Sequence, residues 1–162
     1  VVYNETEAYT EEDKACHAYN GKITQRNKVM FEEAGTIYIY FIYGMYYCLN
    51  IVTEKKGRGC AVLLRGIIPT ININQIKKNR KYIDDKNLTN GPGKLVMALN
   101  IPKDLNGVKL DKNCKLQIKE TNIIIPNIKE TPRIGIKENK DVLWRFISTD
   151  LKKTFKKKKM RV

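Results

Sequence analysis

Residues 36–52 constrain the fold more than any other part of the sequence, because β-branched and aromatic side chains fill most of their positions. Such residues favour extended strands, and Gly44 interrupts the run with a residue that readily adopts turn conformations. The pattern therefore predicts a β-hairpin whose tip lies at Tyr43, Gly44 and Met45.

A further strand is predicted directly after this hairpin. A polar turn at residues 54–59 precedes an apolar run at residues 60–68, which ends near Pro69. Three consecutive strands joined by short turns favour an antiparallel meander. The opening residues 1–5 also have the composition of a strand.

Two helices are predicted after the meander. Residues 72–82 place Ile73, Ile76 and several basic side chains at helical spacing. A Gly-Pro-Gly sequence at residues 91–93 then opens a second helix over residues 94–99, because proline is favoured near a helix start. Both helices are expected to pack on the sheet.

The last third of the sequence shows shorter and weaker signals. A turn is expected at residues 106–107, strands at residues 116–118, 123–125 and 144–147, and a frayed basic tail at residues 156–161. No linker or repeat divides the chain, so residues 1–162 are expected to form one domain. The expected fold class is α+β: a curved, mainly antiparallel β-sheet with surrounding helices and a protruding β-hairpin.

The charge of the chain favours a polyanionic partner. Lysine and arginine number 31 against 17 aspartate and glutamate residues, which gives a formal net charge of +14. Such an excess attracts nucleic acid and raises the rate of association, although a lysine-rich solvated surface is an alternative explanation. No apolar run reaches the roughly 20 residues that span a bilayer, and the opening residues do not resemble a secretory signal. We expect a soluble protein that is not secreted and works in the cytoplasm, the nucleoid or the nucleus.

The cysteine pattern argues against a zinc site. The four cysteines, Cys16, Cys48, Cys60 and Cys114, are widely separated, and His17 is the only histidine that could join them. We expect reduced, buried thiols and neither a metal nor an organic cofactor.

The sequence lacks the motifs of several common enzyme classes: it has no HExxH, GxSxG or GxGxxG, and Gly93-Lys94 is not followed by the Ser or Thr of a P-loop. The segment at residues 5–9 is more informative. In a strand, Glu5, Glu7 and Tyr9 lie on one face, so a carboxylate there could act as a general base. A half-exposed acidic strand with no catalytic role is the alternative.

The order and spacing of several short sequences along the chain resemble one known family. They are Glu7-Ala8-Tyr9, His17, Arg26-Asn27, Met30-Phe31, Gly35-Thr36, Tyr38 to Tyr40, Tyr43-Gly44-Met45-Tyr46, Cys48, Asn50, Leu63-Leu64-Arg65, Gly91-Pro92, Lys94-Leu95, Pro132-Arg133-Ile134-Gly135-Ile136 and Trp144-Arg145-Phe146. The chain resembles the alkyladenine (3-methyladenine) DNA glycosylases, the mammalian-type methylpurine DNA glycosylases. Members usually begin with a segment that precedes the Glu-Thr-Glu-Ala-Tyr strand, so we expect such a segment before Val1.

The resemblance implies a hydrolytic reaction on a flipped purine. Glu7 matches the general base that activates water, Arg65 matches the residue that orients this water, and the main-chain carbonyl of Ile134 completes the water site. The residues that match the base pocket are Tyr9, His17, Tyr40, Asn50 and Leu63. The aromatic members would stack on the base, cationic purines especially well, and Asn50 would discriminate against the amine of normal guanine.

The resemblance also implies how DNA is held. Tyr43 matches the wedge that fills the space left by the flipped nucleotide. The candidate contacts to the DNA backbone are Arg26, Met45, Lys94 and Arg145. The expected substrate is double-stranded DNA containing damaged purines, bound by a monomer, and the expected product is an abasic site.

Two other functions remain open at this point. A non-catalytic, basic nucleic-acid-binding module would use the same aromatic hairpin to stack on bases without releasing them. A metal-dependent nuclease would need clustered carboxylates, for which Glu5, Glu7, Asp84 and Asp85 are a poor set.

Overall fold

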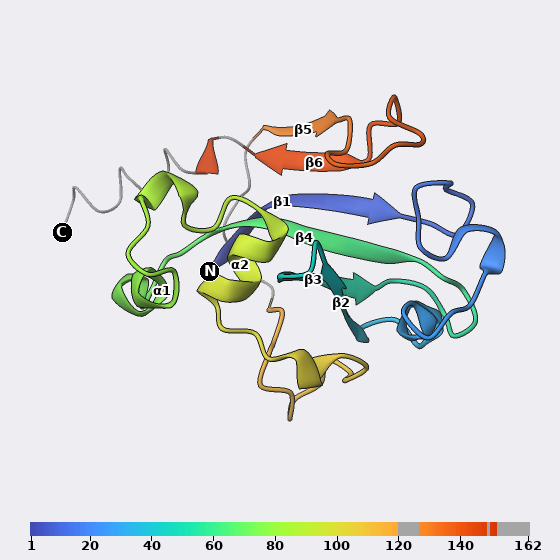
Figure 1. The fold of residues 1–162 in the computed structure, drawn as a ribbon, viewed down its shortest axis with the longest axis horizontal. Helices are drawn as coiled ribbons and strands as arrows, with labels where there is room; N and C mark the ends of the chain where they lie inside the picture. The colour runs from blue at the N-terminus through green and yellow to red at the C-terminus, as the bar shows by residue number, and fades with distance from the viewer. Residues whose placement is uncertain (120–126, 149, 152–162) are drawn as a thin grey trace.

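The computed structural model describes residues 1–119, 127–148 and 150–151, and within them one sheet forms the framework (Figure 1). Its strands are β1 (Val2–Tyr9), β2 (Ile37–Ile42), β3 (Tyr46–Val52), β4 (Ala61–Ile68), β5 (Ile128–Thr131) and β6 (Arg145–Ser148). The order across the sheet is β2-β3-β4-β1-β6-β5, and every neighbouring pair is antiparallel. The expected α+β class and the meander of β2, β3 and β4 are confirmed.

The predicted hairpin is present with its tip where the sequence placed it. Strands β2 and β3 pair in register from Ile37↔Ile51 to Ile42↔Tyr46. At the tip, Tyr43 has φ 54° and Gly44 has φ 66°, and the N–H of Met45 donates to the carbonyl of Ile42 at 3.3 Å. Positive φ at both central residues is what a type I′ turn requires. The Tyr43 side chain is 76% exposed as a result of this position.

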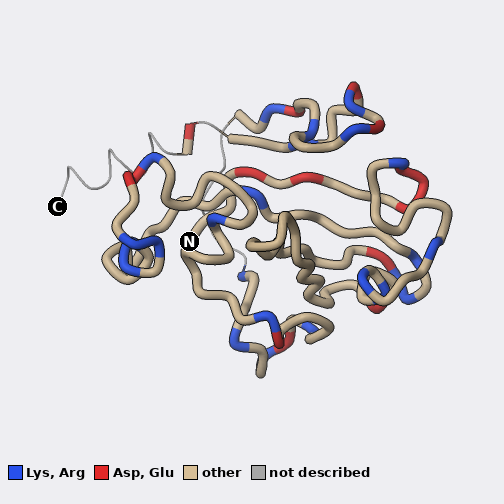
Figure 2. Tube along the Cα trace, viewed as in Figure 1, with Lys and Arg blue, Asp and Glu red and all other residues tan. Residues whose placement is uncertain are grey.

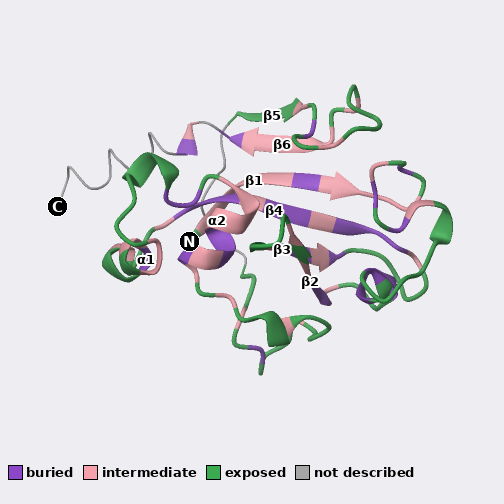
Figure 3. Ribbon diagram, in the orientation of Figure 1, coloured by how far each residue is buried: buried purple, intermediate pink, exposed green. Residues whose placement is uncertain are grey.

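The two faces of the sheet pack against different parts of the chain. One face carries a cluster that includes helix α2 (Pro92–Ala98), and its buried members are Ile37, Ile39, Leu49, Leu64, Ile67, Leu95, Val96 and Cys114. Helix α1 (Ile73–Asn79) packs mainly on α2, where Ile76 joins a buried cluster with Leu88 and Ala98. The expectation that both helices pack on the sheet therefore holds for α2 and not for α1. Figure 3 shows the buried residues concentrated on β4 and α2, while the outer loops are exposed.

The opposite face is covered by the segment between β1 and β2. It contains two short 3-10 helices, η1 (Tyr19–Gly21) and η2 (Lys28–Phe31). Its cluster joins this segment to strand residues, and the buried members are Cys16, Ala18, Val29, Met30, Phe31, Tyr38, Val52 and Ala61. Strand residues alternate between the two clusters, because successive side chains of a strand point to opposite faces.

Several boundaries differ from the sequence predictions. Helix α1 ends at Asn79, before the predicted end at residue 82, because Lys81 and Tyr82 both adopt positive φ and so cannot continue a right-handed helix. Strand β6 begins one residue later than predicted, and β5 was not predicted. Two further 3-10 helices, η3 (Asp85–Asn87) and η4 (Lys103–Leu105), lie in loops that flank α2.

The prediction of a strand at residues 116–118 is wrong. The Asp111 carboxylate accepts hydrogen bonds from the N–H groups of Asn113 and Cys114 at 2.8 and 3.0 Å, which holds the preceding chain in a turn. No strand pairs with residues 116–118 in the described part of the chain, and Ile118 is exposed. The strand predicted at residues 123–125 and the basic tail at residues 156–161 lie outside the described residues. Among the helices that are described, none is long and apolar enough to cross a membrane.

Candidate active site

One row of residues crosses all six strands and brings together residues from distant parts of the sequence. Residues directly opposite each other on antiparallel strands point to the same face of the sheet. The row runs through Thr131, Arg145, Glu7, Leu63, Asn50 and Tyr38, in that order. Tyr9, Tyr40 and Arg65 lie two positions from a member of this row and share its face. This is the face opposite α2.

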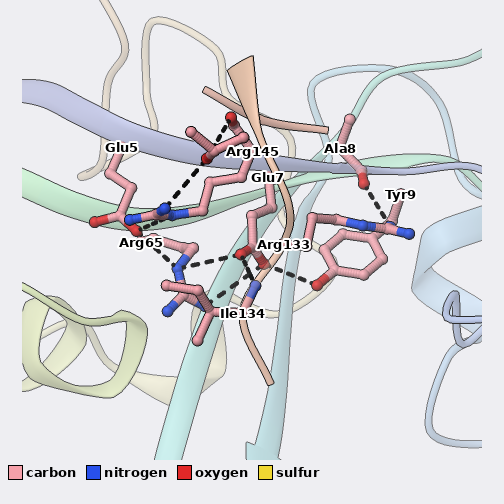
Figure 4. Close-up of polar contacts among 9 residues, drawn as sticks. Glu5, Glu7, Ala8, Tyr9, Arg65, Arg133, Ile134 and Arg145 are labelled. Carbon is pink, nitrogen blue, oxygen red and sulfur yellow. Dashed lines mark hydrogen bonds and ion pairs between the residues drawn. The ribbon is translucent and has the colours of Figure 1, made fainter. Parts of the chain in front are cut away.

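The Glu7 carboxylate lies at the centre of a set of hydrogen-bond donors, as Figure 4 shows. The Tyr9 hydroxyl donates to Oε2 at 2.8 Å, and the main-chain N–H of Ile134 donates to Oε1 at 2.8 Å. Arg65 Nε lies 3.4 Å from Oε1, and Nη1 lies 3.5 Å from Oε2. The Glu7 side chain has 0% exposure, so these donors replace the water that would otherwise solvate a carboxylate.

A second carboxylate holds the arginine beside Glu7. Glu5 Oε1 accepts from Arg65 Nε at 3.1 Å and from Arg145 Nε at 2.7 Å. Arg145 also donates from Nη1 to the Thr131 hydroxyl at 3.2 Å. Figure 2 shows acidic residues in red along β1. The sequence placed Glu5 on the face of Glu7 but assigned it no role, because pairing with two distant arginines leaves no local signal.

Arg133 forms a buried cluster that sequence reasoning missed. Its Nη1 donates to the carbonyl of Ala8 at 2.9 Å and to the carboxylate of Asp13, and both charged side chains have 0% exposure. Burial opposes ionisation of Asp13, but hydrogen bonds from Arg133, the Ala15 N–H and Asn139 outweigh it and hold the pKa of this carboxyl below its ordinary value. Arg133 precedes Ile134, so this cluster anchors the segment that donates to Glu7.

A pocket of about 750 Å³ lies on the same face of the sheet. Its lining includes every residue predicted for the base pocket: Tyr9, His17, Tyr40, Asn50 and Leu63. The wedge candidate Tyr43 and the candidate backbone contact Lys94 also line it, as do Arg65 and Ile134. A volume of this size is typical of sites that enclose a small molecule or a single nucleotide.

His17 contacts aromatic rings with part of its imidazole, although the residue as a whole is exposed and lines the pocket. Its Nδ1 lies 3.0 Å from the Tyr38 hydroxyl, and its ring centroid lies 4.6 Å from that of Tyr40. Desolvation by these neighbours, and secondarily the charge of Arg26, lowers the pKa of His17 to about 4. Burial likewise raises the pKa of the Tyr40 phenol. Both rings are therefore neutral at pH 7.

Gly93 allows α2 to reach the hairpin at the pocket rim. A Cβ at this position would lie 3.0 Å from Cβ of Tyr46, closer than ordinary packing permits. The close approach brings Lys94 to the rim, where its ammonium lies 2.9 Å from the Asn90 side-chain oxygen and 3.3 Å from that of Asn87.

Some predicted site residues lie elsewhere. Arg26 and Met45 are exposed outside the pocket lining, and the guanidinium of Arg145 points inward to Glu5. Glu7 itself does not line the pocket, because Tyr9, Arg65 and Ile134 surround its carboxylate. The main-chain N–H of Ile134, and not its carbonyl, is the group that contacts Glu7. The predicted contact of the Ile134 carbonyl with water stays a prediction.

Among the residues that are described, no group of three or more His, Cys, Asp or Glu side chains is placed to hold a metal ion. All four cysteines are free and buried. The donors collected around Glu7 instead suit a carboxylate that takes a proton from a bound water or stabilises a positive charge.

Comparison with known proteins points to one family. Residues 1–152 match the family model described as methylpurine-DNA glycosylase (MPG). A protein of Clostridium novyi (strain NT), named "Putative 3-methyladenine DNA glycosylase", is 46% identical over 94% of this chain and 81% of its own length. Proteins with the same name from Francisella tularensis subsp. tularensis (strain FSC 198) and Prosthecochloris aestuarii (strain DSM 271 / SK 413) are 44% and 47% identical, each over 90% of this chain and over 77% and 70% of their own lengths.

Proposed function

The chain belongs to the methylpurine-DNA glycosylase family, and from that premise we propose that it is a monofunctional DNA glycosylase of base excision repair. Its substrate is double-stranded DNA that contains an alkylated or deaminated purine. It flips the damaged nucleotide into the pocket and hydrolyses the bond between base and sugar. The products are the free base and an abasic site.

The observation that carries this proposal is the environment of Glu7. A carboxylate enclosed by the Tyr9 hydroxyl, the Ile134 N–H and the Arg65 guanidinium is fixed in position and has a cation beside it to orient water. Such preorganised groups stabilise a transition state without reorganising when the reaction occurs. The three groups come from β1, β4 and the chain before β6, so only the folded protein assembles them.

Glu7 and one water molecule carry out the proposed chemical step. The bond between the sugar C1′ and the purine nitrogen breaks, and its electron pair stays on the base. The sugar becomes oxocarbenium-like, and the negative charge of Glu7 stabilises it. A water oxygen then forms the new bond to C1′ and gives one proton to Glu7, which later releases it to solvent. A base that left as an anion takes up one proton from solvent and becomes the neutral free base. Arg65 and Ile134 line the pocket in front of Glu7, so we place the attacking water between them.

The pocket supports base flipping in this proposal. Tyr9, His17 and Tyr40 present aromatic surfaces that would hold a purine by stacking, worth about 1–3 kcal/mol for each stacked base. Tyr43, at the exposed hairpin tip, would occupy the space that the nucleotide leaves in the duplex. Lys94 and the exposed Arg26 would bind phosphates without regard to sequence. All of these residues lie in one chain, and we propose that a monomer acts.

The test is release of hypoxanthine or an alkylated adenine from a duplex that contains one such base, in EDTA, with abasic sites read by alkali cleavage. We expect release by the native protein and loss of at least about 1000-fold in rate for Glu7→Gln, with DNA binding retained. Glu54→Gln, an exposed change of the same chemistry, should behave as the native protein. Binding without release by the native protein would instead support the non-catalytic nucleic-acid-binding module, and a nick that requires a divalent metal would support a nuclease.

A further inference from the structure

Tyr9 and Tyr40, the two tyrosines of the proposed stacking pocket, each have an arginine against the ring. Arg133 Cζ lies 4.6 Å from the centroid of Tyr9, and Arg26 Cζ lies 5.3 Å from the centroid of Tyr40. Both tyrosines line the pocket, whereas neither arginine does. The two guanidinium groups therefore contact the rings from outside the pocket.

The protein holds Arg133 firmly in this position. The residue donates to the Ala8 carbonyl and to Asp13, and its guanidinium also lies over the Trp144 ring at 5.2 Å. In the described part of the chain, its Nε and Nη2 are buried without any hydrogen-bond partner. Aromatic faces occupy the space where acceptors would otherwise be, so contact with the rings is the principal interaction left for these atoms.

Arg26 is more exposed but is also anchored. Its Nη2 donates to the carbonyl of Phe41 at 3.2 Å, which places the guanidinium beside the outer part of β2 and over Tyr40. Its charge also contributes to the lowered pKa of His17, which lies beside Tyr40 and stays uncharged at neutral pH. A guanidinium thus lies behind the proposed stacking rings of Tyr9 and Tyr40. Within the described residues, no guanidinium lies over the third ring, that of His17.

A guanidinium behind a ring changes what the front of that ring attracts. The face of a tyrosine is negative because of its quadrupole, and this attracts a cation. A second cation on the other face competes for the same π electrons and is repelled by the first across the ring. A cationic purine, such as one alkylated at a ring nitrogen, should therefore gain less from Tyr9 and Tyr40 than it would from isolated tyrosines.

We propose that Arg133 and Arg26 are specificity-determining residues which offset the preference of the tyrosine stack for cationic purines, so that neutral damaged purines are accepted as well as cationic ones. The inference rests on the proposed glycosylase function. What it adds is that these two arginines set the balance between cationic and neutral bases in the pocket.

The same charges would assist the departure of a neutral base. When the bond to C1′ breaks, the electron pair remains on the purine, which makes a neutral base anionic and a cationic base neutral. Guanidinium groups behind the two rings stabilise the anionic product, while Glu7 stabilises the opposite charge on the sugar. The site would thus have the positive guanidinium groups behind the base and the negative carboxylate of Glu7 near the sugar.

The test compares two bases that have one shape and differ in charge. 7-Methylguanine is cationic in mildly acidic buffer, and 7-methyl-7-deazaguanine is its neutral counterpart. Glu7→Gln is the background for every protein, so that bound DNA stays intact, and the measured quantity is the ratio of the two Kd values. With both arginines present, we expect the two Kd values to agree within about threefold.

Two variants remove the charges with little risk to folding. Arg26→Gln is an exposed change, and Asp13→Asn combined with Arg133→Gln removes both members of a buried pair, so that neither charge is left uncompensated. In each variant, the Kd for the cationic base should fall by roughly fivefold relative to the Kd for the neutral base. Two controls should shift the ratio little. Arg26→Lys keeps the charge, and Arg58→Gln removes a charge from partly exposed ion pairs with Glu11 and Glu12.

The ratio separates a charge effect from a general loss of affinity, because weakened phosphate contacts or a slightly disturbed fold would affect both DNAs equally. An unchanged ratio in both charge-removing variants would overturn the inference, as would a strong preference of the arginine-containing protein for the cationic base. Release of hypoxanthine by the protein with native Glu7 is measured alongside. If no damaged base is released, it is the proposed function that fails, whatever the ratio.

Discussion

Arg65 Nε lies 3.1 Å from Oε1 of Glu5 and 3.4 Å from Oε1 of Glu7, so one guanidinium connects two carboxylates on the same strand. Arg145 approaches Glu5 from the other side at 2.7 Å. Glu5 therefore balances the charge of two arginines and leaves Arg65 directed at Glu7. We regard Glu5 as a positioning residue, because it acts on the reaction only through Arg65.

Replacing Glu5 should slow the chemical step more than it weakens binding. In Glu5→Gln the amide oxygen can still accept a hydrogen bond, but the charge that holds Arg65 is lost. We expect the single-turnover rate of base release to fall about tenfold while the Kd for lesion-containing DNA changes little. A fall in rate that is fully explained by weaker DNA binding would contradict a positioning role. Glu130→Gln, an exposed change on β5, is the matched control.

The turn conformation of Tyr43 leads to a prediction that separates stability from function. A tyrosine at φ 54° is strained relative to glycine, and its side chain is largely exposed. Tyr43→Gly should therefore keep or raise the free energy of unfolding, by up to about 1 kcal/mol, while base release falls strongly because the wedge is lost. Urea unfolding and release assays on one preparation measure both quantities. Equal activity of Tyr43→Gly and the native protein would remove Tyr43 from the flipping step.

His17 offers a direct measurement because it is the only histidine in the chain. Its pKa is lowered to about 4 by burial and by the charge of Arg26. The unfolded chain takes up this proton near the ordinary value of 6.5, so the stabilising contribution of neutral His17 is present above pH 6.5 and is lost as the pH falls toward 4. NMR titration should show one imidazole that is still neutral at pH 5.5, and Arg26→Gln should raise its midpoint. A midpoint near 6.5 in the native protein would show that the ring is solvated.

The buried pair of Arg133 and Asp13 predicts an effect of pH with a defined sign. The pKa of Asp13 is lowered, so its contribution to stability is present above the ordinary value of 3.8 and is lost as the pH falls through the lower folded-state value. Asp13→Asn leaves Arg133 uncompensated and should cost about 3–5 kcal/mol at neutral pH. Because the native protein loses the same ion pair in acid, the difference in free energy of unfolding between the native protein and Asp13→Asn should narrow below about pH 3.8. Urea midpoints measured from neutral to acidic pH test this, and a constant difference would argue against an ionised Asp13.

Strong local patterns made some of the fold predictable from the sequence. The hairpin around Gly44 and the helix after Gly91 have residues whose own preferences agree with their structures. Strand β5 has no such signal, since three of its four residues are exposed and it depends on pairing with β6. Residues 116–118 show the opposite. Their composition is typical of a strand, but none of the described strands pairs with them.

The site was predictable where the family pattern names a residue, and less so where a contact depends on the folded chain. All five residues predicted for the base pocket line one cavity, although their roles in binding a base stay predictions. Nothing in the local sequence links Arg133 to Asp13, which lies 120 positions away. The buried position of Glu7 could not be anticipated either, because its exposure is set by Tyr9, Arg65 and Ile134 together.

The hydrogen bond from Ile134 to Glu7 joins residues 127 positions apart. During synthesis, Glu7 leaves the ribosome before its donor does, because strands β2, β3 and β4 lie between the two residues in the sequence. A nascent chain could therefore form the aromatic hairpin well before the Glu7 carboxylate has its full set of donors. Appearance of base release during refolding would accordingly report the docking of the segment around Ile134 rather than formation of the hairpin.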